Sequence, residues 1–140
     1  MVVYRTGVDC IDWGMLFELY SQVGLVAGLG KKKDYKKIES AFRNCSKVVT
    51  AWKNNLLLGA GRLFTDGITY GVIFDVGVLP EYHNQGIGRG IMKELLKNTE
   101  SLYIYLTSTF GNEEFYRKLG FKRHKNAFAK YPHESEYLED

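Results

Sequence analysis

The stretch from Val76 to Met92 constrains this chain most. A β-branched segment runs into a loop, and the loop passes through Gly86, Gly88 and Gly90 directly into a helical pattern. Glycine lets the backbone approach a ligand closely, and the start of a helix presents unpaired N–H groups and the positive end of its dipole. Backbone of this kind binds phosphate groups. The stretch therefore predicts a ligand with a pyrophosphate or a similar anion.

Two common phosphate-binding patterns do not fit these glycines. A dinucleotide-binding loop has the pattern G-x-G-x-x-G, and Ile91 stands where its third glycine would fall. No acidic residue ends a second strand about 20 residues further on. A Walker loop needs G-x-x-x-x-G-K-[ST], whereas Arg89 and Gly90 follow Gly88. A plain tight turn between a strand and a helix is the remaining alternative to a phosphate site.

The stretch resembles the acetyl-CoA-binding motif of the GCN5-related N-acetyltransferase (GNAT) family, in which V-x-P leads into [QR]-x-x-G-x-[GA]. Val78-Leu79-Pro80 is the lead, and the loop begins at His83, where the family usually has Gln or Arg. The resemblance implies a set of acetyl-CoA contacts made largely by backbone N–H groups. These contacts are His83, Asn84, Gln85, Gly86, Ile87, Gly88 and Arg89, with the backbone of Val76, Gly77 and Val78 along the pantetheine arm.

A second motif, Phe115-Tyr116-Arg117-Lys118-Leu119-Gly120-Phe121, resembles the F-Y-x-x-L-G-F ending of the same family. In that family the tyrosine lies beside the thioester sulfur. The resemblance therefore implies that Tyr116 is catalytic and that Phe115 contacts acetyl-CoA. Taken alone, Tyr116 fits a half-buried core aromatic equally well. Many relatives carry Asn seven residues before the tyrosine, and this chain has Thr109 there, so a CoA contact from that side chain stays open.

Upstream segments are similar to one subgroup of the family. They include Ser40–Ser46, Leu58–Gly67 and Ile73–Val76, so that the resemblance covers roughly residues 38 to 121. The subgroup holds small plant-plastid and bacterial acetyltransferases, some acting on aralkylamines such as serotonin and some on protein lysines. The match is specific for acyl transfer and much less specific for the acceptor.

Length predicts a single domain over residues 1–140, since a chain of this length buries enough surface for a core without disulfides or metal, and this agrees with the small enzyme that the resemblance implies. No run of 18 apolar residues and no signal-peptide pattern occurs, so we expect no membrane partner. The chain has two Cys and three scattered His without metal-ligand spacing. These features predict no metal site and a reduced, cytoplasmic location.

The charge of the chain gives no support for a nucleic-acid partner, and it leaves the role of one lysine cluster undecided. A net charge of +3 is too small to argue for nucleic acid. Five lysines gather within a short span: Lys31, Lys32, Lys33, Lys36 and Lys37. They form either a solvated basic turn or a basic rim that attracts an acidic acceptor or the CoA phosphates.

Hydrophobic periodicity, caps and turn residues give a consistent layout. Strands are predicted at Val2–Thr6, Lys47–Trp52, Leu56–Phe64, Ile68–Val78, Leu102–Thr107, Phe121–Lys125 and Ala127–Tyr131. Helices are predicted from Asp12 to Val23, Asp34 to Asn44, Gly88 to Asn98 and after Asn112, and Gly24–Gly30 is expected to be a flexible loop. This order predicts an α/β (α+β) fold of the GNAT acyl-CoA N-acyltransferase type. Its mixed, mostly antiparallel sheet would have six to seven strands flanked by about four helices.

The expected reaction needs a base and a proton donor. A free alkylamine is almost wholly protonated at neutral pH, so a base must take its proton directly or through water. In an extended strand Asp75 and Gly77 point to one face and Phe74, Val76 and Val78 to the other. Asp75 is then the best-placed carboxylate for a base, with a structural acid as the equal alternative. Tyr116 would protonate the leaving thiolate.

The acceptor is predicted less sharply than the cofactor. We expect a small primary amine, with a protein lysine as the alternative and a homodimer as a possible assembly. Four aromatic residues are expected near the mouth of the site, although core packing explains most of them equally well: Trp13, Tyr20, Trp52 and Tyr131. A catalytically inactive acetyl-CoA sensor and a module for another phosphorylated ligand remain as alternative functions.

Overall fold

The computed structural model describes residues 1–25 and 34–140. Two compact units make up the chain, Met1–Thr107 and Ser108–Asp140, and each is described by itself. The flexible loop expected at Gly24–Gly30 lies mostly outside the described residues, as do Lys31, Lys32 and Lys33 of the basic cluster. A single domain over residues 1–140 stays a prediction.

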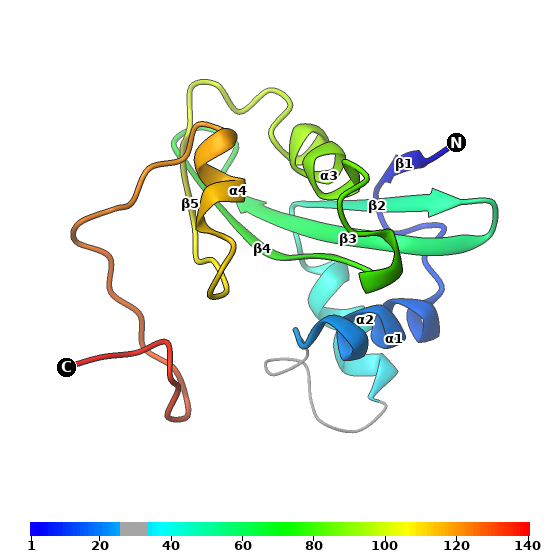
Figure 1. Cartoon of the computed structure of the whole chain (residues 1–140), viewed down its shortest axis with the longest axis horizontal. Helices are drawn as coiled ribbons and strands as arrows, with labels where there is room; N and C mark the ends of the chain where they lie inside the picture. Colours follow the sequence, from blue (N-terminus) through cyan, green and yellow to red (C-terminus); the bar gives the residue numbers. More distant parts are fainter. Residues whose placement is uncertain (26–33) are drawn as a thin grey trace. The chain divides into compact units, whose positions relative to one another are not determined.

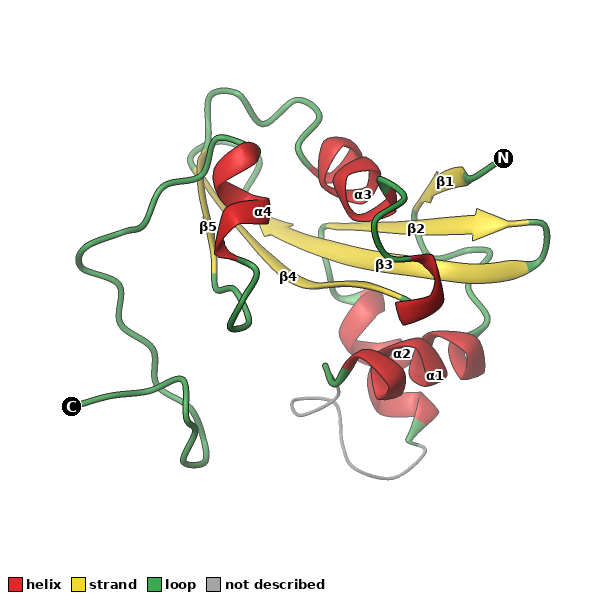
Figure 2. Cartoon of the chain, viewed as in Figure 1, coloured by secondary structure: helices red, strands yellow, loops and turns green. Residues whose placement is uncertain are grey.

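The first unit is built on a five-stranded sheet of order β1-β2-β3-β4-β5. Its strands are β1 (Val3–Thr6), β2 (Lys47–Lys53), β3 (Leu56–Thr65), β4 (Tyr70–Val78) and β5 (Tyr103–Leu106). Neighbouring strands are antiparallel except β4 and β5, which are parallel. The helices α1 (Trp13–Val23) and α2 (Tyr35–Arg43) cover one face, and α3 (Ile87–Leu95) covers the other (Figures 1 and 2). The predicted mixed, mostly antiparallel sheet is confirmed, although with fewer strands.

Three aspartates start elements where the sequence predicts. The Asp12 carboxylate accepts the backbone N–H of Met15 at 3.0 Å, and Asp34 caps α2 in the same way. Asp66 closes the turn between β3 and β4, where its Oδ1 accepts the N–H of Ile68 and Thr69 at 2.8 Å each. These backbone hydrogen bonds lower the pKa of Asp66 to about 2, which shows that the turn holds the ionised carboxylate.

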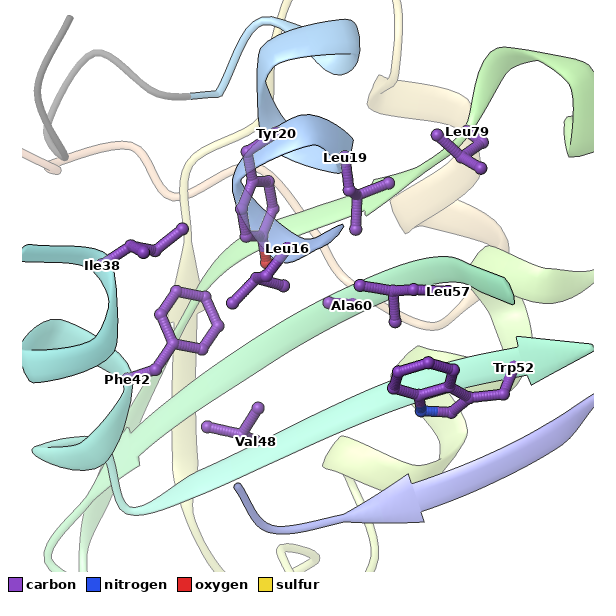
Figure 3. Close-up of a cluster of buried hydrophobic side chains, with 10 residues drawn as sticks. All are labelled: Leu16, Leu19, Tyr20, Ile38, Phe42, Val48, Trp52, Leu57, Ala60 and Leu79. Carbon is purple, nitrogen blue, oxygen red and sulfur yellow. The ribbon is translucent and has the colours of Figure 1, made fainter. Parts of the chain in front are cut away.

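The main core lies between the sheet and the pair α1 and α2 (Figure 3). Helix α1 contributes Leu16, Leu19 and Tyr20 to this core, and α2 contributes Ile38 and Phe42. Both helices carry these residues three or four positions apart, which puts them on one face. From the sheet, the cluster takes Val48, Trp52, Leu57, Ala60 and Leu79.

Glycines on β3 let α3 approach the opposite face closely. A Cβ at Gly61 would lie 3.0 Å from Ile91 Cγ2 and 3.1 Å from Leu95 Cδ1. A Cβ at Gly59 would lie 2.9 Å from Ile91 Cδ1 and 2.8 Å from the carbonyl oxygen of Gly77. The buried face of α3 therefore packs directly against the backbone of β3. This contact fixes the start of α3, to which the glycine-rich loop leads.

The second unit contains α4 (Glu113–Lys118). Gly120 follows the helix with φ +94°, and the N–H groups of Gly120 and Phe121 donate to the carbonyls of Arg117 and Tyr116. This pair of bonds is the Schellman ending, which favours glycine at that position. The helix end predicted at Gly120 is therefore confirmed.

The strands predicted at Phe121–Lys125 and Ala127–Tyr131 are wrong. Neither segment is a strand, and most of their side chains are exposed. Charged residues interrupt both segments, so each offers little apolar surface to bury, and a strand gains stability only from a partner and a buried face. None of the helices in residues 1–25 and 34–140 has the length and apolar character that a membrane crossing requires.

Substitution of Gly59 tests the close packing of α3 against β3. We expect Gly59→Ala to destabilise the protein by about 1–3 kcal/mol, because the new methyl group overlaps the Gly77 carbonyl and Ile91. Urea unfolding measures the change. Gly14→Ala is the matched control, since its new Cβ meets only Asp12 Oδ1, at 3.3 Å. Equal stability of the Gly59→Ala protein and the wild type would contradict the close packing.

Candidate active site

A β-bulge interrupts β4 at Asp75. The register pairs Ala60 with Gly77 but Arg62 with Phe74, so that two residues of β4 lie opposite Gly61 of β3. Asp75 has φ +58°, a left-handed conformation that only a few residue types such as Asp and Asn adopt readily. The sequence gives no sign of this bulge, since the surrounding residues alternate regularly.

The bulge reverses one prediction about side-chain direction. Val76 and Val78 lie on the α3 face, beside Gly61 and Gly59, and Gly77 lies opposite Tyr20 and Val23 of α1, as predicted. Phe74 was expected on the face away from Asp75. Instead its ring lies 6.1 Å from Phe64, on the face where Arg62 bonds Asp75. The extra residue turns Phe74 and Asp75 to the same face.

Asp75 is held by two side chains. Its carboxylate accepts Nε–H of Arg62 at 2.9 Å, with the two side chains only 12% and 19% exposed. The hydroxyl of Tyr20, which is fully buried, donates to the Asp75 carbonyl at 2.8 Å. Burial raises the pKa of the Asp75 carboxyl, and the Arg62 charge opposes that rise. Both its side chain and its backbone are therefore fixed.

Arg62 is the residue of this site that sequence reasoning did not find. Its Nη1 donates to the Ala41 carbonyl at 3.2 Å, and its guanidinium lies 4.7 Å from the Phe42 ring centroid and 5.2 Å from that of Phe64. A signal was present, because charged residues inside a strand pattern are seldom buried without a partner. The sequence does not show that Asp75 is the partner.

Beyond the bulge, one edge of β4 is open. Pairing with β5 ends at Ile73 and Leu106, and among the described residues no strand follows on that side. The N–H of Leu79 donates to Leu58 on β3, so the polar backbone groups of Val78, and by alternation those of Val76, point to the open edge. These groups are free of β3 and available to an extended ligand, whereas the backbone of Gly77, which was also predicted to contact the pantetheine arm, pairs with Ala60.

The glycine-rich loop leads into the N-terminus of α3, where the sequence predicts an anion site. Gly86 begins the helix with φ +79°, and the first bond inside the helix runs from the Gly90 N–H to the Gly86 carbonyl at 3.0 Å. The N–H groups of Ile87, Gly88 and Arg89 come before that bond and have no partner inside the helix. Asn84 also has a positive φ, of +63°, which bends the loop toward the helix.

His83 has a role that its place in the motif does not indicate. Its ring Nε2 lies 2.7 Å from the Val78 carbonyl, so the ring donates to the end of β4. The side chain thereby ties the loop to the open edge. Its predicted role as a backbone contact to acetyl-CoA is compatible with this bond.

Tyr116 belongs to the second unit. Its ring packs edge-on against Phe115 at 5.0 Å and Phe121 at 6.1 Å. Burial raises the pKa of its hydroxyl, so the group stays protonated at neutral pH and is able to donate a proton. The catalytic role of Tyr116 and the acetyl-CoA contact of Phe115 stay predictions.

Of the four aromatic residues predicted near the site, only Tyr20 contacts Asp75, through its buried hydroxyl. Tyr20 and Trp52 are core residues, and Trp13 packs against that core. Tyr131 belongs to the second unit. The aromatic side chains on the Arg62 face of β4 and β5 are instead Phe74, Tyr70 and Tyr103, which are 40%, 54% and 66% exposed.

A cavity of about 310 Å³ lies in the first unit, and Glu18, Tyr35, Leu56 and Leu79 are among the residues that line it. Leu79 directly follows Val78, the last residue of β4. In the described part of the chain, no three His, Cys, Asp or Glu side chains come together to hold a metal ion.

Comparison with known families agrees with this geometry. The acetyltransferase (GNAT) domain family matches residues 44–123, more than half of the chain. The chain belongs to the GNAT acetyltransferase family. Its members use acetyl-CoA as co-substrate, and the unpaired N–H groups of α3 together with the open edge of β4 fit such a ligand.

Individual relatives agree with the family. An uncharacterized N-acetyltransferase, ycf52, of Porphyra purpurea is 29% identical over 126 residues, which cover 85% of this chain and 70% of the relative. The uncharacterized N-acetyltransferase CgeE of Bacillus subtilis is 23% identical, over 89% of this chain and 52% of that protein. A GNAT family acetyltransferase from Streptococcus pneumoniae TIGR4 superposes with a TM-score of 0.76 at 25% identity, over 95% of this chain and all of that chain.

Heat protection by acetyl-CoA tests the anion site. A ligand that binds only the folded protein raises its melting temperature, and we expect acetyl-CoA to do so. Gly88→Val should abolish this protection, because a branched side chain blocks the unpaired N–H groups. Lys93→Val, further along the exposed side of α3, is the control for the cost of a β-branched residue in a helix. Unchanged protection in a folded Gly88→Val protein would contradict the site.

Proposed function

We propose that this acetyltransferase moves the acetyl group of acetyl-CoA to a small primary amine by direct attack in a ternary complex. One observation carries the proposal above all. The unpaired N–H groups at the start of α3 lie at the same end of the fold as the open edge of β4, tied to it by the His83 ring. This arrangement can hold a pyrophosphate and an extended amide-bearing arm together.

The chain's own groups divide the binding of acetyl-CoA between them. The loop from His83 to Arg89 takes the pyrophosphate through backbone N–H groups. The backbone of Val76 and Val78 takes the amides of the pantetheine arm along the open edge. The thioester then comes to the Asp75 end of that edge, because the arm runs away from α3. A backbone N–H there can stabilise the developing oxyanion.

The chemistry forms a C–N bond and breaks the C–S bond. The amine loses a proton to a base, directly or through water, and the leaving thiolate gains one. Tyr116 is our candidate for the thiolate donor, because it stands at the tyrosine position of the family motif and its hydroxyl is protonated at neutral pH. The sequence nominates Asp75 as the base, and any role for Asp75 must accommodate its ion pair with Arg62.

The surface beside the bulge favours an amine with an apolar or aromatic body. Phe74 adjoins Asp75 in sequence and shares its face, and Tyr70 and Tyr103 extend the exposed aromatic surface along β4 and β5. Aromatic rings bind flat apolar groups and also attract cations at their faces. This surface supports an arylalkylamine, as in part of the subgroup that the sequence resembles. Cytoplasmic location and a homodimer stay predictions.

A panel of acceptors tests the proposal directly. With acetyl-CoA held in excess, release of CoA thiol is followed for arylalkylamines, alkylamines and lysine-containing peptides. We expect turnover with arylalkylamines that exceeds the peptide background. Turnover of peptides alone would favour a protein-lysine acetyltransferase. Acetyl-CoA binding with no turnover of any acceptor would favour a sensor.

Tyr116→Phe tests the proton donor. We expect kcat to fall by about 10²-fold, the lower end of the 10²–10⁴ range for a general acid, because a thiolate leaves moderately well without a proton. KM for acetyl-CoA should barely change, since the ring and its contacts with Phe115 and Phe121 remain. With a thioester whose leaving thiol is more acidic, the substitution should lower kcat less. Full kcat in Tyr116→Phe would make Tyr116 a packing residue.

A further inference from the structure

We propose that Arg62 and Asp75 act together as positioning residues, which hold the bulge that opens the edge of β4, and that Asp75 does not take the proton of the amine. This inference rests on the proposed acetyl transfer and assigns the base differently from the sequence. It follows from the contacts that Asp75 makes and from where they lie in the sheet.

The bulge needs external support because its backbone conformation is unfavourable. A residue other than glycine meets steric strain in the left-handed region, although less for Asp and Asn than for other residues. Asp75 has that conformation inside a strand, whereas the other positive-φ residues apart from glycine, among those described, are asparagines. Two contacts hold it in place. The Tyr20 hydroxyl from α1 binds its carbonyl, and Arg62 from β3 binds its carboxylate.

Arg62 is in turn fixed on all sides. Its guanidinium donates to the Ala41 carbonyl near the end of α2 and lies over the rings of Phe42 and Phe64. The ion pair therefore links β4 to β3 and to α2 at one point. A planar guanidinium can make these contacts simultaneously, which the point charge of a lysine cannot.

These contacts also argue against Asp75 as the base. Its Oδ2 already accepts the Arg62 Nε–H. Protonation of the carboxylate would leave the guanidinium, only 12% exposed, without its counter-charge. If Asp75 were the base, its carboxylate would have to become protonated, and so lose its ion pair with Arg62, in every turnover. The amine proton instead passes to solvent through water, and the Asp75 charge stays paired throughout.

What the pair positions is the open edge. The last residue pair between β4 and β5, Ile73 with Leu106, comes two residues before Asp75. The backbone groups of Val76 and Val78, which the proposal assigns to the pantetheine arm, come directly after it. A shift of about 1 Å in a reacting group can cost on the order of 10²-fold in rate. Loss of the pair would move these groups and thereby slow the transfer.

A series of four variants separates positioning from proton transfer. Asp75→Asn keeps an oxygen for Arg62 and tolerates the left-handed conformation, so we expect kcat to fall by no more than about tenfold. Asp75→Ala and Arg62→Gln lose the contact, and each should lower kcat on the order of 10²-fold. Arg62→Lys should resemble Arg62→Gln. In the double variant Arg62→Gln, Asp75→Ala the losses should not add, since both remove one interaction.

The opposite pattern would overturn the inference. A base requires that Asp75→Asn lose about 10²–10⁴-fold in kcat, as much as Asp75→Ala, while Arg62→Gln stays active with a shifted pH profile of kcat/KM. If Asp75 only positions the edge, the Asp75→Asn variant keeps the wild-type pH profile of kcat/KM. Circular dichroism and melting curves select a temperature at which every variant is folded.

A binding measurement keeps the inference distinct from the proposed function. Calorimetric titration with CoA should show weaker affinity in Asp75→Ala and Arg62→Gln than in Asp75→Asn, because the arm contacts the displaced edge. If the wild type binds CoA but acetylates no amine, the proposed function fails and this ranking alone decides the inference. If in that case all variants bind CoA with equal affinity, the inference that Arg62 and Asp75 position the open edge is overturned.

Discussion

The ion pair between Arg62 and Asp75 joins the two strands on which the candidate site depends. It forms where β4 carries one residue more than β3, and the parallel pairing of β4 with β5 ends at the preceding residue pair. An unpaired strand edge can pair with another extended chain. Here the His83 ring links that edge to the loop before α3, where we propose that a phosphate binds, so a ligand that carries both a phosphate and amides could contact both.

The second constraint is the contact between α3 and β3. Because Gly59 and Gly61 have no side chains, α3 lies directly on the sheet, with Ile91 and Leu95 against backbone. The first turn of α3 is then rigidly placed relative to β4, and the His83 ring links the loop to Val78. Packing on one face and an ion pair on the other thus fix the strand that carries the open edge.

Sequence reasoning was wrong where it had to know which face a residue occupies. Phe74 was assigned to the wrong face and shares the face of Asp75, whereas Tyr20 and Trp52 are core residues, as the stated alternative had it. Period-two alternation holds only while a strand stays regular, and the bulge breaks it between Phe74 and Asp75. The strands predicted after Phe121 failed for another reason, since strands need partners that local sequence does not name.

The sequence by itself determined most elements from Val3 to Lys118, the glycine-rich turn into α3, the helix ending at Gly120 and the GNAT family. These features depend on local chemistry: caps, glycines in turns, and apolar residues at fixed spacing. Only the tertiary structure decided that Arg62 pairs with Asp75, that Tyr20 binds the Asp75 carbonyl, and that the edge of β4 opens after Ile73. Those contacts join residues 13 and 55 positions apart, and such pairings are set by the packing of the whole sheet against its helices.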